Sequence, residues 1–467
     1  MRINTNINSL QAQRTLAANN GDLSTRLQRL STGLKINSGK DGPAALIASE
    51  NMRSEIAGLS QAIDNSARAI NVINTAEGSL AEINSLLLEV QSLTVEAANS
   101  GALSPAEIEA NQLQVDAILG SINRISNTTT FNGEKLLNGA KDYQLSGVPV
   151  SAIADVKVNS AALSDNQPLA VEVDVTLSAQ TGRITKPGPT GATPVTLEIA
   201  GNKGVEQVTF APTTAVSAMV FAINQLTDST GVSATDSGAN MHIDSVGYGA
   251  KSFVSVTAIS GTWPVGATGR DEGRDVQASI NGAIAEGDGL DLKARIGDLD
   301  IEMSLDVAFA TQTAVTKGFD ITGGGATFQV GSRVDGQGQV NVGIGSVNTT
   351  KLGSNEVGFL SQLSASGDAS LISGNTTKAQ QILDEAIAEV ATMRGRLGAL
   401  QKNVLETNMN SLRVARENVT AAESDIRDAD FAMETAALTR AQILTQANTS
   451  ILSQANQAPQ QVLSLLQ

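Results

Sequence analysis

Apolar side chains recur at alternating spacings of three and four residues from about residue 43 to residue 99. This stretch contains no aromatic residue and no proline after Pro43, and its heptad spacing is typical of a coiled-coil helix. A helix of that length would reach roughly 80 Å, so it needs a second long helix to cover its apolar row. The positions predicted to pack are Ile56, Leu59, Ile63, Ile70, Ile73, Leu80 and Leu87.

The same period returns near the other end of the chain, after a capping-box pair formed by Thr377 and Gln380. Gly395 and Gly398 interrupt this second pattern and weaken the helix locally. We expect the two long helices to pack against each other along their apolar rows. The positions predicted to pack on the second helix are Val390, Leu397, Leu400 and Val404.

A helical hairpin is predicted where the first long helix ends. Gly101 is a plausible end signal, and Ser104-Pro105-Ala106-Glu107 is a capping box with proline at the first helical position. An apolar face with helical spacing follows as far as Ile125. The turn residues Phe131-Asn132-Gly133 then lead out of the helical region.

Weaker heptad patterns occupy both ends of the chain. Asn, Gln, Ser, Thr and Ala surround their apolar residues, so neither segment would form a stable helix alone. We therefore expect both segments to be disordered in the monomer and to fold when the chain assembles. The apolar positions of this predicted core are Leu16, Leu23, Leu27, Leu30 and Leu34 at the N-terminal end and Ile426, Met433 and Ile443 at the C-terminal end.

The middle of the chain changes period. Alternation such as Val171-Glu172-Val173-Asp174-Val175 predicts strands, and frequent glycine and proline suit an antiparallel β-rich insert. The fold class is therefore α+β, with a long antiparallel helical core from both termini around a central β-rich insert. The chain is predicted to divide into five parts. They are a terminal core segment (1–42), a helical hairpin (43–140), the outer insert (141–325), a hairpin with the second rod helix (326–420) and a second terminal core segment (421–467).

Composition limits the classes of function. A formal net charge of −16 and a pI near 4.6, with no basic stripe, argue against nucleic-acid binding. The chain has no cysteine and no apolar run of membrane-spanning length, and its first residues do not form a signal-peptide pattern. No membrane association is expected, and an extracellular destination would require another export route.

Candidate chemistry is sparse. His242 is the sole histidine, so a histidine-based catalytic triad would have no other histidine to use. An HExxH zinc site needs two histidines and is excluded. The acidic residues Asp288, Asp291, Asp298 and Asp300 lack EF-hand spacing and indicate a solvated strand edge. The glycines at 323–325 indicate a turn before a strand, because no Lys-Ser/Thr follows. No enzymatic activity, cofactor or metal is predicted.

The two ends together resemble bacterial flagellin. The motifs that match are Leu30-Ser31-Thr32-Gly33-Leu34-Lys35-Ile36-Asn37 and Asp41-Gly42-Pro43-Ala44 at one end, and Ile426-Arg427-Asp428-Ala429-Asp430-Phe431 and Arg440-Ala441-Gln442-Ile443-Leu444 at the other. The resemblance covers roughly residues 1–140 and 325–467. Within the insert, Ile223-Asn224 in a β-α-β context also looks like a motif of flagellins and hook-associated proteins.

This resemblance implies a structural subunit that polymerises into the extracellular flagellar filament for motility and leaves the cell by type III export. It implies contacts with further copies of the chain, with the filament cap and with hook–filament junction proteins. It also implies a secretion chaperone, with apolar anchors at Ile426, Met433, Leu444, Ile451 and Leu463. The alternatives are a junction protein, or a filament subunit whose insert acts as an adhesin or enzyme.

The family resemblance also implies recognition by Toll-like receptor 5 through an arginine, a leucine and a glutamate. Glu89, Leu93 and Gln114 occupy the matching positions, so only the leucine is kept. The change from arginine to Glu89 reverses a charge, and Gln114 removes a carboxylate. We expect weak receptor recognition.

Overall fold

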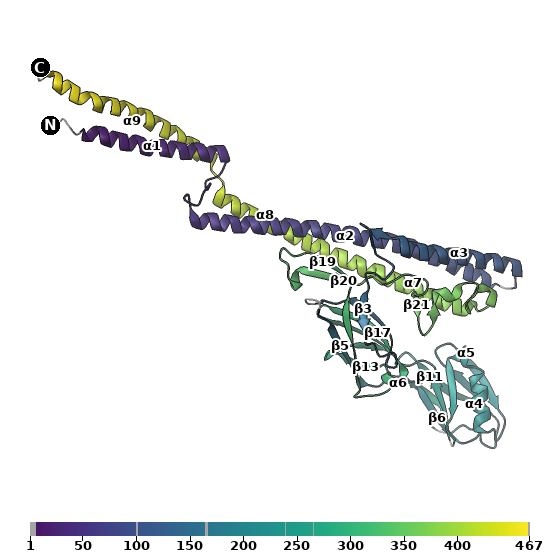
Figure 1. Cartoon of the computed structure of the whole chain (residues 1–467). Helices are drawn as coiled ribbons and strands as arrows, with labels where there is room; N and C mark the ends of the chain where they lie inside the picture. The colour runs from purple at the N-terminus through teal and green to yellow at the C-terminus, as the bar shows by residue number, and fades with distance from the viewer. Residues whose placement is uncertain (1–5, 100, 164–166, 239, 265, 466–467) are drawn as a thin grey trace. The chain divides into compact units, whose positions relative to one another are not determined.

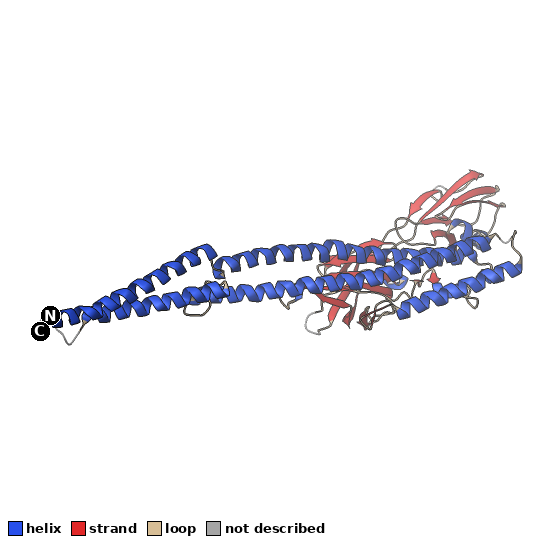
Figure 2. Ribbon diagram, turned by 90° about the horizontal axis from the view of Figure 1, so that it is seen from above, coloured by secondary structure: helices blue, strands red, loops and turns tan. Residues whose placement is uncertain are grey.

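The computed structural model describes residues 6–99, 101–163, 167–238, 240–264 and 266–465, with side chains described as far as residue 457. Helices occupy both ends of the chain and strands occupy its middle (Figures 1 and 2). The predicted α+β class is therefore confirmed. The chain divides into two compact units, residues 1–67 with 329–338 and 404–467, and residues 68–328 with 339–403.

Two terminal helices pair in the first unit: α1 (Ile7–Thr32) and α9 (Phe431–Leu465). Asn6 caps α1 by accepting a hydrogen bond from the Ser9 amide at 3.0 Å. Gly33 ends the same helix with φ of 74°, a left-handed conformation that glycine adopts without strain. Both ends of the chain are therefore helical in this structure.

The first unit also holds α8 (Thr407–Arg427) and the beginning of α2 (Pro43–Ala98). The Ser49 hydroxyl donates to a Glu423 carboxylate oxygen at 2.9 Å, which joins α2 to α8. The Lys35 amide donates to the Arg427 carbonyl at 2.7 Å, so the segment after α1 lies against the end of α8.

A helical bundle forms the rod of the second unit, where α3 (Pro105–Thr128) and α7 (Thr376–Ala399) accompany the rest of α2. The predicted capping box before α3 is present, with the Ser104 amide donating to Glu107 at 2.7 Å. Arg394 pairs with Glu77 at 2.7 Å and so links α7 to α2. Short 3-10 turns, Leu360–Leu363 and Leu371–Ser373, lie against α3.

The second long helix is not one continuous α-helix. A π-helical segment, Leu400–Glu406, separates α7 from α8. Its i→i+5 hydrogen bonds widen the turn by one residue, which shifts every later side chain around the helix. Gly395 and Gly398 lie just before this segment. The two glycines therefore predicted a locally weakened helix at about this place, but not a π-helical segment.

The first β module of the insert has one core between two antiparallel sheets. The five-stranded sheet has the order β14-β13-β5-β18-β3, and the four-stranded sheet has the order β15-β16-β17-β4. Their bounds are β3 (Tyr143–Ser146), β4 (Ile153–Ser160), β5 (Leu169–Leu177), β13 (Gln277–Ile280), β14 (Ala283–Ile284), β15 (Glu286–Asp288), β16 (Asp291–Ile296), β17 (Leu299–Leu305) and β18 (Thr316–Gly324), with α6 at Val307–Ala310.

A second β module with its own core is inserted in the sequence between β5 and β13, where one insert was predicted. Its sheets have the orders β6-β10-β9 and β12-β11-β7-β8. The bounds are β6 (Arg183–Pro187), β7 (Val195–Ala200), β8 (Val205–Phe210), α4 (Val216–Asn224), α5 (Thr227–Thr230), β9 (Val232–Asp236), β10 (Asn240–Ser245), β11 (Phe253–Ser260) and β12 (Gly269–Glu272).

The predicted helix between two strands is present as α4, but β8 and β9 lie in different sheets. The side chain of Asn224 links α4 to the strand that follows it. Its side chain accepts a hydrogen bond from the Ala234 amide at 2.7 Å and donates to the Ala234 carbonyl at 3.0 Å. The amide therefore binds α4 to β9 in the way that a neighbouring strand would.

Three two-stranded sheets complete the fold: β1 (Thr130–Phe131) with β2 (Glu134–Lys135), β19 (Ala326–Gln329) with β20 (Gln339–Val342), and β21 (Gly353–Ser354) with β22 (Gly358–Phe359). A short 3-10 turn, Gly336–Gly338, precedes β20. Asn132 and Gly133 both have positive φ and form the predicted turn between β1 and β2. Gly325, with φ of 75°, forms the predicted turn between β18 and β19.

Candidate functional site

The contact between α1 and α9 is built mainly from small and half-buried side chains. On α1, Ser9 and Ala12 are buried, and Leu16, Leu23 and Leu30 are half-buried at heptad spacing. On α9, the covered residues also recur at heptad spacing, and most of them are small or polar. These residues are Glu434, Leu438, Ala441, Thr445, Asn448, Leu452 and Ala455.

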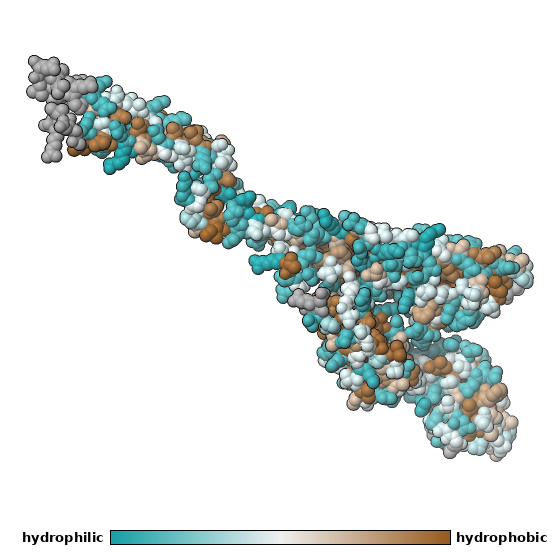
Figure 3. Space-filling view, viewed as in Figure 1, coloured by the Kyte–Doolittle hydropathy of each residue, from teal (hydrophilic) through white to brown (hydrophobic). Residues whose placement is uncertain are grey.

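Large apolar side chains of the same helix pair remain exposed. Leu27 is 50% exposed, so it is not covered by α9, and Leu34 is half-buried after α1. Met433 and Ile443 are 72% and 60% exposed, so they do not belong to the line that faces α1. Brown atoms on this pair are visible in Figure 3. Among the side chains that the structure describes, the exposed large apolar ones on this pair are Ile7, Leu10, Leu27, Phe431, Met433, Ile443, Leu444 and Ile451.

An ionic cluster fixes the register of the two terminal helices. Arg26 and Arg29 of α1 each reach a Glu434 carboxylate oxygen of α9 at 3.0 Å. Burial alone would raise the pKa of Glu434, but the hydrogen bonds from both arginines outweigh it and hold that pKa below its ordinary value. Glu434 is 7% exposed. The hydrophobic pattern of the sequence did not predict this burial, because a carboxylate is not expected among the apolar residues between two packed helices.

The proposed chaperone anchors have different surroundings. Ile426 is half-buried near the end of α8, whereas Leu444 and Ile451 are 45% and 53% exposed on α9. The side chain of Leu463 lies outside the described residues. The structure therefore leaves three of the anchors, Met433 included, accessible to another protein.

The predicted rod positions are mostly covered. Ile73, Leu80, Leu87, Val390 and Leu397 are 0% exposed. Leu59 and Ile63 are also buried, while Ile56, Ile70 and Leu400 are half-buried. Val404 is 39% exposed, because it lies within the π segment that shifts the apolar row.

The three predicted receptor positions are not equally accessible. Glu89 and Gln114 are exposed, and the Gln114 amide donates to Glu89 at 3.0 Å. Leu93, however, is 8% exposed, so little of its side chain is accessible in the monomer.

A polar junction attaches the first β module to α7. Arg396 donates to the Gly343 carbonyl at 2.9 Å and also bonds with Asn159. Burial lowers the pKa of Arg396, while nearby carboxylates oppose that shift. Lys157 pairs with Glu389 at 2.8 Å beside it. Several polar contacts to α7 therefore hold the insert on the rod.

The candidate chemistry of the insert resolves into structural contacts. His242 lies 2.9 Å from the Thr185 hydroxyl, across neighbouring strands. Asp300 pairs with Arg295 at 2.8 Å, Asp288 pairs with Lys251, and Asp291 bonds with Ser304. In the part of the chain that the structure describes, no group of three acidic, histidine or cysteine residues could hold a metal ion, and no helix is long and apolar enough to cross a membrane.

Comparison with known proteins decides the family. The bacterial flagellin N-terminal helical region matches residues 3–142, and the C-terminal helical region matches residues 380–466. B-type flagellin of Pseudomonas aeruginosa is 31% identical over 523 aligned positions, covering 100% of this chain and 99% of that protein. The chain belongs to the bacterial flagellin family. This flagellin is a structural subunit of the flagellar filament.

Further relatives agree with that assignment. Flagellin B of Vibrio cholerae is 30% identical over 470 positions, covering 100% of this chain and 99% of the relative. A flagellar junction protein from Legionella pneumophila is similar to 81% of this chain at 15% identity and a TM-score of 0.29, covering 99% of its own length. The full-length flagellin relatives favour a filament subunit over the junction-protein alternative.

Proposed function

We propose that this subunit polymerises through a filament core made from α1 and α9, and that these helices become fully ordered only on assembly. The observation that carries the proposal is the set of large apolar side chains left exposed on the pair, such as Ile7, Phe431 and Met433. Neighbouring subunits would cover this surface, and its burial would offset the ordering entropy of two weak helices.

The rest of the chain does not depend on that core. The rod bundle and both β modules have buried apolar cores of their own. Deletion of residues 1–40 or of residues 421–467 should therefore abolish filaments and leave the remaining chain folded. Electron microscopy of protein incubated with filament seeds measures the first effect, and circular dichroism melting measures the second. Filaments formed by either truncated chain contradict the proposal.

The subunit reaches the extracellular flagellum by type III export in this proposal, and a secretion chaperone binds its C-terminal segment before assembly. Support comes from the exposed Met433, Leu444 and Ile451, which lie on one helix and would otherwise attract other subunits in the cell. Deleting residues 425–467 should abolish retention by the chaperone in a pull-down. Unchanged retention by that truncated chain would contradict the assignment.

Recognition by Toll-like receptor 5 is proposed to be weak. Glu89 and Gln114 form an exposed hydrogen-bonded pair without a positive charge, and Leu93 is covered by the bundle. Glu89→Arg with Gln114→Glu should raise the potency of the monomer in a reporter-cell titration, since a mismatched interface charge costs about 2–5 kcal/mol when buried. Full potency of the unaltered monomer would contradict this proposal.

The subunit has a structural and not an enzymatic role in this proposal, and its two β modules form the outer part of the filament. Contacts with the filament cap and with the junction proteins follow from its place in the same assembly. Two of the acidic residues of the insert, Asp288 and Asp300, form ion pairs with Lys251 and Arg295, contacts that link elements of the fold.

A further inference from the structure

Each of the two sheets in the second β module has two edge strands, and three of these four edges are covered by another part of the chain. The Asn224 side chain occupies the edge of β9, where it bonds to both the amide and the carbonyl of Ala234. The edges β6 and β12 lie beside each other, and the Arg183 amide donates to an Asp271 carboxylate oxygen at 2.7 Å. The fourth edge, β8, pairs with β7 on one side, and no residue that the structure describes bonds to its backbone on the other side.

The open edge has the composition of a strand that pairs readily. The six residues of β8, Val205–Phe210, include two valines, a threonine and a phenylalanine, and they include no glycine or proline. Exposed segments of this length, with high strand propensity and little charge, tend to add to another strand. Glu206 is the one charged residue in β8. Its side chain is therefore the feature that sets this edge apart from a strand that would pair with another chain.

Glu206 lies on the face of the sheet that carries the apolar core. Alternate residues of a strand share a face, and the next two on this face of β8, Val208 and Phe210, contribute to the core of the module. Residues directly opposite each other in an antiparallel pair also share a face. Ile199 of β7, which is 0% exposed, lies opposite Glu206, which is exposed. A carboxylate therefore stands where the apolar row would continue, at the open edge.

We propose that Glu206 keeps β8 from pairing with the β8 of a second copy of the chain. A two-fold axis perpendicular to the sheets would place the two strands antiparallel and would join the core face of one sheet to that of the other. Both Glu206 carboxylates would then leave water for an apolar row, and β8 contains no lysine or arginine to pair with them. If the β modules form the outer part of the filament, as proposed above, the same residue keeps neighbouring filaments separate.

Two substitutions of Glu206 in the full-length chain test this role. Glu206→Val completes the apolar row, so the chain should self-associate about tenfold more tightly than the unaltered chain in sedimentation equilibrium without filament seeds. The amides of β8 should become protected from hydrogen exchange in the associated protein, because the second copy then bonds to the open edge. Glu206→Lys keeps a charge at the same position, so this chain should remain as monomeric as the unaltered one.

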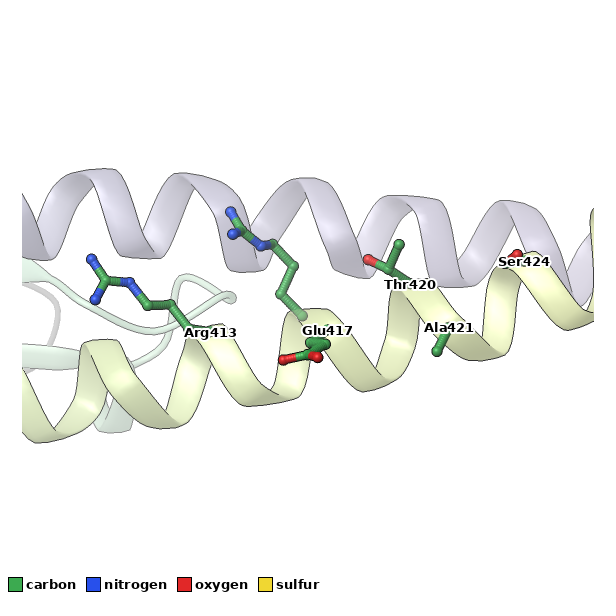
Figure 4. A pocket seen from close by; sticks show the side chains of 6 residues that line it. Arg413, Glu417, Thr420, Ala421 and Ser424 are labelled. Atoms are coloured by element: carbon green, nitrogen blue, oxygen red, sulfur yellow. The ribbon is translucent and has the colours of Figure 1, made fainter.

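Two matched controls carry the same change from glutamate to valine away from an open edge. Glu198 lies between two buried residues of β7, the strand next to β8, and therefore points to the opposite face of the sheet. Glu417 lies with Arg413 and Arg416 along a shallow depression of α8, where the helix satisfies its own backbone (Figure 4). Glu198→Val and Glu417→Val should each remain as monomeric as the unaltered chain.

The proposal is overturned if Glu206→Val stays as monomeric as the unaltered chain while circular dichroism shows an intact fold. Equal association of Glu206→Lys also overturns it, because a charge would then not block the edge. Equal association of the two controls does the same, since any added valine would suffice. Association of Glu206→Val without protection of the β8 amides places the contact elsewhere and contradicts the proposal. All of these measurements use unpolymerised protein, so their outcome is independent of the proposed filament core.

Discussion

The rod bundle and the terminal helix pair are both heptad helices, yet they bury very different side chains. The bundle covers leucine and isoleucine completely, as at Ile73, Leu80 and Leu87. The terminal pair covers serine and alanine and leaves its largest apolar groups in solvent. Heptad spacing therefore indicates where a helix can pack, whereas the size of the covered side chains indicates whether the resulting helix pair is stable without neighbouring subunits. One pair is complete within the monomer, and the other needs neighbours.

The largest effect on the monomer should come from the rod bundle. Leu80 is 0% exposed, so Leu80→Ala removes buried surface, leaves a cavity and should lower the free energy of unfolding by about 2–5 kcal/mol. Leu27→Ala is the matched control, because Leu27 is 50% exposed, and should cost less than about 0.5 kcal/mol. Urea unfolding followed by circular dichroism measures both. Equal losses would remove the contrast between the two regions.

A smaller effect should follow acidification of the terminal pair. Glu434 has a pKa below its ordinary value of 4.5, so its stabilising contribution is present above that pH and is lost as the pH falls through the lowered pKa. In the filament, where the two helices are ordered, contact between α1 and α9 should therefore loosen in acid below about pH 4.5, while Glu434→Gln should remove this dependence. A spin label on one helix broadens the NMR signals of the other helix while the two are close, so a loss of this paramagnetic broadening measures the loosening. An unchanged acid transition in Glu434→Gln would show that other groups control the pair.

The smallest effect on the monomer should be the largest on the filament. Leu27→Asp places a charge on an exposed position of α1, so monomer stability should change by less than about 0.5 kcal/mol. In the filament the same charge would be buried against a neighbour without a partner, and polymerisation should fail. Sedimentation after seeding measures polymer, and thermal melting measures the monomer. Normal filaments from Leu27→Asp would show that this side of α1 remains in solvent.

The helical parts of the fold could be predicted well from the sequence. Leu80 and Val390 follow the helical period and are buried, and the capping box at Ser104 follows local chemistry and is present. The π segment could not be predicted, because Gly395 and Gly398 indicate weakness but not the direction of the distortion. The division of the insert into two modules was also missed, since alternation predicts strands but not which strands share a sheet.

The assembly surfaces show a similar limit. Leu16, Leu23 and Leu30 could be placed on the α1 side of the terminal contact by spacing alone. The line on α9 was missed because small side chains such as Ala441 give no hydrophobic signal, and the larger Met433 and Ile443 drew the prediction to another face. The burial of Leu93 could not be predicted, because alignment with a family motif carries no information about burial in this chain.

Hydrogen exchange of monomer and filament, resolved by helix, tests the central claim most directly. If the terminal pair is completed only by neighbouring subunits, amides of α1 and α9 should exchange rapidly in the monomer and become protected in the filament. Amides of α2, α3 and α7 in the rod bundle should be protected in both states, because their apolar core is already closed. Equal protection of α1 and α9 in monomer and filament would contradict the coupling of folding to assembly.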